Sequence, residues 1–179
     1  MAVAATTLAA SVKSMIDKGA KYITVANIPD VSQTPMAMAT IVYNTDGSIK
    51  DNSQQKLILA MTTAFNSALK GALETSPGVM PAQIVFVDAF AENQRQLKDP
   101  AHYALTNVKD VACNLDYPAN VLATNGVAGS GSSLVCNSKN LVAGDSSHYL
   151  FADHLHPTPY GHKLLAQYAI KALVIAGWI

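Results

Sequence analysis

The fold is constrained most by two short apolar segments, residues 21–27 (Lys-Tyr-Ile-Thr-Val-Ala-Asn) and 83–88 (Gln-Ile-Val-Phe-Val-Asp). Both are typical of strands that are buried on both faces. An amphipathic helical pattern precedes each of them, over residues 3–18 and over a stretch that begins at Asp51 or Asn52 and ends near Gly71. This alternation predicts an α/β fold with a parallel strand pair joined by a right-handed crossover. Two such strands cannot be buried alone, so the sequence predicts part of a doubly wound sheet.

The remaining segments fill in this outline. Residues 31–50 are rich in turn residues and predict a long connection at the edge of the first strand, where active sites often lie. Residues 89–98 predict a short helix, and residues 101–147 predict mostly loop. Thr158 can cap a final amphipathic helix with Pro159 in its first turn. In the second helix, Met61 and Phe65 are expected in the core.

Composition limits the classes of partner. The chain has 179 residues with 50% hydrophobic and only 13% charged content, which suits one domain with a sizeable core. Its 12 basic and 12 acidic residues cancel, so neither nucleic acid nor an anionic membrane is expected to bind. No apolar run is long enough to predict a membrane span, and residues 1–10 do not predict a signal peptide.

Two cysteines, Cys113 and Cys136, lie in a segment rich in Asn, Gly and Ser, where they are free to meet across a loop. A bond between them would contribute on the order of 3 kcal/mol by restricting the unfolded chain. Two unpaired thiols in a reducing compartment are the alternative.

An acid/base pair stands near the C-terminus. Asp153 precedes His156 by three residues, which allows a carboxylate–imidazole contact in a turn, and Pro157 and Pro159 stiffen the backbone that follows. A carboxylate that accepts a hydrogen bond from one ring nitrogen fixes the tautomer and makes the histidine an effective general base. A purely structural role for the pair also fits the spacing.

Histidines cluster around this pair, so zinc is a further hypothesis. His148, His154 and His162 lie close in sequence to Asp153 and His156, and alternate histidines can present two imidazoles on one side of an extended segment. The spacing matches no zinc-hydrolase pattern that we recognise. The alternative is that His148, His154 and His162 are surface or capping residues.

Residues 151–162 (Phe-Ala-Asp-His-Leu-His-Pro-Thr-Pro-Tyr-Gly-His) resemble the last conserved block of the GDSL lipases and esterases, or SGNH hydrolases. Residues 25–35 (Val-Ala-Asn-Ile-Pro-Asp-Val-Ser-Gln-Thr-Pro) and 99–108, followed by Cys113 and then Cys136, are similar to the bacterial lipase and autotransporter-esterase branch. The resemblance covers essentially the whole chain, but only the C-terminal half of the family.

The resemblance implies roles for two residues. Asp153 would orient the base, and His156 would act as general base and then as general acid. The family's nucleophilic serine, oxyanion glycine and asparagine would precede this sequence and have no matching positions in it. Gly144-Asp-Ser-Ser147 spells most of the nucleophile motif, but it stands in a loop just before His156, so Ser146 is expected to be a solvated turn residue.

Together these observations predict that residues 1–179 are the C-terminal portion of one SGNH-type domain, with a partial, flavodoxin-like, three-layer fold and a mostly parallel sheet. The expected activity is carboxylester hydrolysis on an ester or lipid, without metal or organic cofactor, in a secreted or periplasmic protein. A catalytically inactive fragment or binding module of the same fold is the alternative. The first strand should present an unpaired edge, so we expect self-association or an N-terminal partner fragment.

Overall fold

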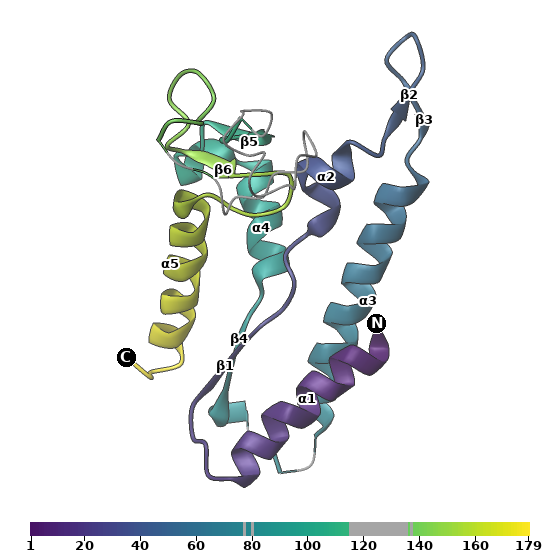
Figure 1. Ribbon diagram of the computed structural model, residues 1–179. Coiled ribbons are helices and arrows are strands. Elements are labelled where there is room, and N and C mark those ends of the chain that lie inside the picture. The colour runs from purple at the N-terminus through teal and green to yellow at the C-terminus, as the bar shows by residue number, and fades with distance from the viewer. Residues whose placement is uncertain (77, 80, 115–135, 137) are drawn as a thin grey trace.

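The computed structural model describes residues 1–76, 78–79, 81–114, 136 and 138–179 (Figure 1). Five α-helices occur in this part of the chain: α1 (Ala2–Asp17), α2 (Pro35–Met38), α3 (Ser53–Thr75), α4 (Ala89–Lys98) and α5 (Pro159–Ile175). The strands are β1 (Ile23–Ala26), β2 (Val42–Tyr43), β3 (Ile49–Asp51), β4 (Ile84–Val87), β5 (Asn107–Val111) and β6 (Tyr149–Phe151). Short 3-10 helices are η1 (Val31–Gln33), η2 (Pro81–Gln83) and η3 (Pro100–Tyr103).

The strands form small, mostly parallel sheets. β1 and β4 pair in parallel with Val25 opposite Phe86, and β5 pairs in parallel with β6. β2 and β3 form an antiparallel hairpin. The two strands predicted from apolar runs are β1 and β4, and their parallel pairing through α3 is confirmed. The predicted α/β fold class is therefore confirmed as well.

The main core lies between β1–β4 and the helices α1 and α3. Its buried side chains come from all three elements: Ala5, Ala9, Val12, Val25, Leu69 and Leu73. Figure 1 shows α1 and α3 on one side of β1 and β4, with α5 on the other side, where it contacts β4. The strands thus lie between two helical layers. A second cluster of Leu105, Leu150, Phe151 and Leu164 joins β6 to α5.

Several local predictions are wrong. α3 continues through Gly71 to Thr75, because Leu69 and Leu73 on either side of the glycine remain packed in the core, and this outweighs the cost of about 1 kcal/mol for an interior glycine. Met61 is 40% exposed, since α1 covers only the C-terminal half of α3, where Phe65 packs against the core as predicted.

Two segments expected to be loops contain regular structure. Residues 31–50 hold η1, α2 and the β2–β3 hairpin, and β5 lies within the 101–147 segment. The residues of the hairpin strands are all exposed and β5 is at most half-buried, so neither shows the apolar pattern by which strands are recognised.

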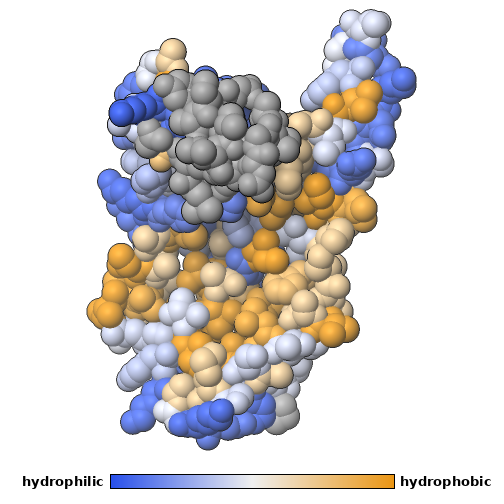
Figure 2. Space-filling model, in the orientation of Figure 1, coloured by the Kyte–Doolittle hydropathy of each residue, from blue (hydrophilic) through white to orange (hydrophobic). Residues whose placement is uncertain are grey.

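One edge of β1 is unpaired in the described part of the chain, as predicted, because β4 is its partner on one side and the sheet ends there. Figure 2 shows hydrophobic residues gathered around this region of the surface. Exposed apolar side chains on α1, α5 and the neighbouring segments include Val3, Met15, Tyr22, Ile170, Val174 and Ile175. None of the described helices has the length and apolarity needed to cross a membrane.

Candidate active site

The acid/base pair lies in a tight loop between β6 and α5. The N–H of Ala152 donates to the carbonyl of His156 at 2.8 Å, and Phe151 forms an antiparallel bridge with Pro157. These contacts close the loop at its base. The side chains of Asp153 and His156 are therefore held over a short, pinned stretch of backbone.

Asp153 organises this loop from inside. Its side chain is only 4% exposed, and Oδ1 accepts hydrogen bonds from the backbone N–H groups of Leu155 (2.7 Å) and His156 (2.6 Å). Oδ2 accepts from Nδ1–H of His156 at 2.8 Å. Hydrogen bonds to both oxygens fix the carboxylate plane, and an ionised carboxylate is the form that accepts all three.

His156 projects outward from the same loop. Its side chain is 54% exposed, and within the described residues Nε2 has no hydrogen-bond partner. Since the Nδ1 proton is committed to Asp153, the lone pair on Nε2 is the one available to accept a proton. The two predicted site residues are thus brought together in the geometry of an oriented base.

The first turn of α5 supports this loop. Thr158 caps the helix by accepting from the N–H of Gly161 at 3.0 Å, and its hydroxyl donates to the carbonyl of Tyr149 at 2.6 Å. The backbone N–H of Thr158 donates to the carbonyl of Leu150 at 2.9 Å. A Cβ on Gly161 would lie 2.9 Å from the Leu150 carbonyl oxygen and from Pro157 Cβ. Thr158 was predicted as a cap, but the close packing at Gly161 was not.

The segment after β1 also reaches the loop. The N–H of Met36, at the start of α2, donates to the carbonyl of His154 at 2.9 Å. The hydroxyl of Thr34 caps this short helix by accepting a hydrogen bond from the N–H of Ala37. The carboxylate of Asp30 caps η1 by accepting from the N–H of Ser32. Residues 31–38 therefore flank the Asp153–His156 pair, in keeping with the prediction that this connection lies near the site. The contact itself, between two backbone groups, has no sequence signal.

The other histidines do not converge on the pair. The ring of His148 stacks on Tyr160 with centroids 4.1 Å apart, and its Nδ1–H donates to the carbonyl of Ala104 at 2.8 Å. His154 and His162 are exposed. In the part of the chain that the structure describes, no group of three or more His, Cys, Asp or Glu side chains is arranged to hold a metal ion.

Ser146 is not a solvated residue, contrary to expectation, because it is only 7% exposed. It borders a hollow lined also by Cys113, Cys136 and Thr158. The neighbouring turn is held by Asp145, which accepts from the hydroxyl and N–H of Ser147, and these bonds lower the pKa of Asp145. No hydrogen bond joins Ser146 to His156, although both lie in the described residues.

The two cysteines are bonded. Cys113 and Cys136 form a disulfide with Cα atoms 5.8 Å apart. Cys113 is nearly completely buried at the end of β5, and its N–H donates to the carbonyl of Ala152, the residue before Asp153. The disulfide therefore anchors the segment around Cys113 beside the acid/base loop.

Comparison with known proteins identifies the family of the chain. Residues 1–169 match the family model of the GDSL-like lipases and acylhydrolases. The chain belongs to this family. A GDSL esterase/lipase of Arabidopsis thaliana is 20% identical over 177 residues, which cover 90% of this chain and 42% of the plant protein.

A second relative is an uncharacterized protein from the trpE–trpG intergenic region of Pseudomonas putida. It is 28% identical over 175 residues, which cover 96% of this GDSL-family chain and 25% of the bacterial protein. The chain thus spans less than half the length of either curated relative.

Proposed function

We propose that this chain supplies the base half of a serine carboxylester hydrolase, as the C-terminal portion of a GDSL-type hydrolase domain. The observation that carries the proposal is the 2.8 Å bond from His156 Nδ1 to buried Asp153, with Nε2 left facing outward. Family membership supports the reaction class. The substrate would be an ester or lipid of low molecular weight.

In the proposed reaction, Nε2 of His156 removes the proton from a serine hydroxyl as the oxygen attacks the ester carbonyl. The imidazolium, stabilised by Asp153, then protonates the departing alcohol. Water repeats the sequence on the acyl-enzyme and releases the acid. The serine of the family's Gly-Asp-Ser-Leu block is absent from these 179 residues, so we assign it to a preceding segment of the same domain.

Two further features fit this proposal. The disulfide between Cys113 and Cys136 is of the kind that forms in oxidising compartments, which supports a secreted or periplasmic location. One edge of β1 is unpaired among the described residues and has apolar side chains exposed nearby, so it offers a strand-pairing surface for an N-terminal fragment or for a second copy of the chain.

The test is hydrolysis of p-nitrophenyl butyrate by the 179-residue chain, alone and after addition of a family segment that carries the serine block. We expect turnover only in the mixture, and we expect His156→Ala to abolish it while His154→Ala, on the adjacent exposed histidine, leaves it intact. A mixture that assembles but does not turn over would favour the alternative of a non-catalytic interaction module.

A further inference from the structure

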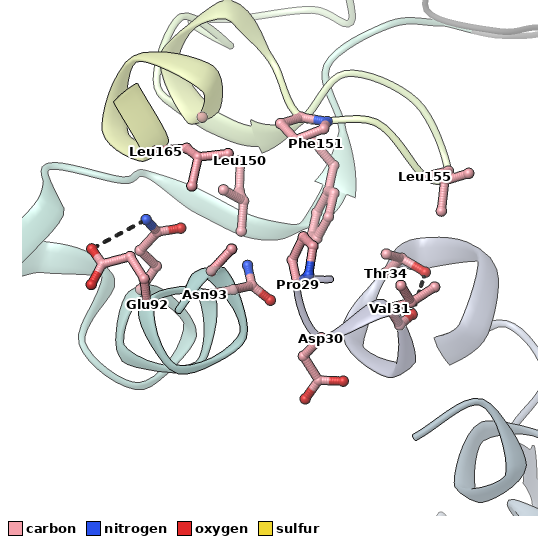
Figure 3. Close-up of a pocket in the computed structure, with 14 residues that line it drawn as sticks. Pro29, Asp30, Val31, Thr34, Glu92, Asn93, Leu150, Phe151, Leu155 and Leu165 are labelled. Carbon is pink, nitrogen blue, oxygen red and sulfur yellow. Dashed lines mark hydrogen bonds between the residues drawn. The ribbon is translucent and has the colours of Figure 1, made fainter. Parts of the chain in front are cut away.

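A cavity of about 160 Å³ lies beside the acid/base loop, between that loop, the segment after β1, and helices α4 and α5 (Figure 3). Its walls include the residues on either side of His156, namely Leu155 and Pro157. The apolar side chains that line it include Val31, Ala89, Leu150, Phe151, Leu155 and Leu165. The steps of the reaction proposed above assign no role to this cavity.

The two acidic side chains on the walls, Asp30 and Glu92, are buried and already engaged with the protein. Asp30 accepts from the N–H and hydroxyl of Ser32, and Glu92 accepts two hydrogen bonds from Arg95 at 2.9 and 2.7 Å. The hydrogen bond to Glu92 raises the pKa of Arg95, and each side chain satisfies the hydrogen bonding of the other. A ligand that entered would therefore meet mainly hydrocarbon, which selects an apolar group.

Exposure indicates where the cavity opens. Leu155 is 40% exposed, whereas Leu150, Phe151 and Ala89 are exposed by only 2%, 4% and 3%. Figure 3 shows Leu155 at one side of the cavity, facing Val31 and Thr34, and Leu150 and Leu165 toward the other side. The cavity is thus open beside Leu155, on the loop that carries His156, and also beside the exposed Pro29, while Leu150, Phe151 and Ala89 form its buried walls.

We infer that this cavity binds the acyl chain of the ester, and that it limits the chain to about six carbon atoms. The inference rests on the proposed hydrolase function. A mainly apolar cavity suits the acyl group, because that group stays bound through both half-reactions while the alcohol must leave. The size limit follows from volume, since an apolar cavity of about 150 Å³ holds one benzene molecule, with its six carbons.

Binding can be measured without turnover. Unbranched methyl ketones carry the carbonyl and chain of an ester but cannot be hydrolysed, so a series with ethyl, butyl, hexyl and decyl chains isolates the cavity from the chemistry. Titration of the 179-residue chain is followed by the methyl NMR signals of Val31, Leu150, Leu155 and Leu165. We expect Kd to fall about fourfold per methylene up to hexyl, and to gain little from hexyl to decyl.

Matched substitutions localise the effect. Val31→Phe fills the cavity and should remove the gain from ethyl to hexyl, whereas Val42→Phe, on the exposed β2 strand, should preserve it. Ala89→Leu fills the cavity from α4 and provides a second test if Val31→Phe perturbs folding, which the dispersion of the NMR spectrum reveals. Affinity that keeps rising steeply to decyl, shifts confined to the exposed face of α5, or equal behaviour of Val31→Phe and Val42→Phe would overturn the inference. None of these outcomes depends on hydrolysis.

Discussion

Nδ1 of His156 lies 2.8 Å from Oδ2 of Asp153, yet the two side chains differ sharply in exposure, 54% for the histidine and 4% for the aspartate. The carboxylate is buried where backbone N–H groups hold it, and the ring extends toward solvent. This asymmetry gives the imidazole a fixed orientation without occupying the nitrogen that accepts a proton in the proposed reaction.

Asp153→Asn tests that orientation in the assembled enzyme. An asparagine side chain can donate to Nδ1, which stabilises the tautomer that carries its proton on Nε2 and so removes the base. We expect kcat to fall by about 10⁴, as in the corresponding change in a serine protease triad. Steady-state hydrolysis of p-nitrophenyl butyrate measures it. A loss below about tenfold would mean that Asp153 is only a structural support of the loop.

Gly161→Ala tests the packing beneath the loop. The new Cβ would lie 2.9 Å from the Leu150 carbonyl oxygen and Pro157 Cβ, so α5 must shift away from β6, at a cost of about 1–3 kcal/mol. Gly71→Ala is the matched control, because nothing lies within 4 Å of its Cβ, and it should stabilise α3 by about 0.5–1 kcal/mol. Urea unfolding of both variants gives the comparison, and equal effects would refute the packing argument.

These two tests also mark what sequence could and could not predict. The Asp153–His156 contact spans three residues, so spacing alone indicated it, and β1, β4, α4 and α5 follow from apolar periodicity and caps. Two other contacts form only where the backbones of separate elements come close together. They are the packing of Gly161 against Leu150 and the hydrogen bond from the N–H of Met36 to the carbonyl of His154. No local pattern encodes such contacts.

β5 was missed for a related reason. Its sequence, Asn-Val-Lys-Asp-Val, carries polar residues that reach solvent, and its pairing with β6 across some forty residues stabilises it. Burial of Ser146 was missed too, because a Gly-Asp-Ser-Ser turn is typical of surface loops. In each case tertiary contacts overrode the local preference.

Removing the disulfide should destabilise the chain substantially. Cys113 and Cys136 have a sequence separation of 23, and the N–H of Cys113 donates to the carbonyl of Ala152 beside the acid/base loop. We expect Cys113→Ser with Cys136→Ser to lower the free energy of unfolding by about 3 kcal/mol. Urea unfolding of the oxidised chain, the reduced chain and the double variant measures this. A loss under about 1 kcal/mol would contradict a stabilising role for the bond.

Alkaline pH should weaken the fold through Tyr103. Burial is the main cause that raises the pKa of this phenol above its ordinary value of 10.0, and the charge of Glu92 adds to it. The unfolded chain therefore loses the proton first, so the contribution to stability is complete below pH 10 and is lost as pH rises through the raised pKa.

Tyr103→Phe should flatten this decline in unfolding free energy, measured with urea between about pH 8 and 11, the range that spans tyrosine titration. Tyr22→Phe is the control, because Tyr22 is 70% exposed and rests edge-on against Trp178. If both variants decline with pH as the parent chain does, the slope has another source.

The edge of β1 that no strand of the described segments pairs with predicts association of the isolated chain. Thr24 and Ala26 on this strand are exposed, and the backbone groups along its open edge can pair with a strand of another molecule. We expect the mean mass in sedimentation velocity to rise above the 18.9 kDa monomer as concentration increases. Thr24→Lys should weaken this association about tenfold or more, a change of roughly 1.4 kcal/mol, because charged residues on an edge strand oppose pairing. Thr75→Lys, at the exposed end of α3, carries the same charge without touching β1 and should associate like the parent. A parent chain that stays monomeric at every concentration would show that the β1 edge is not a docking surface.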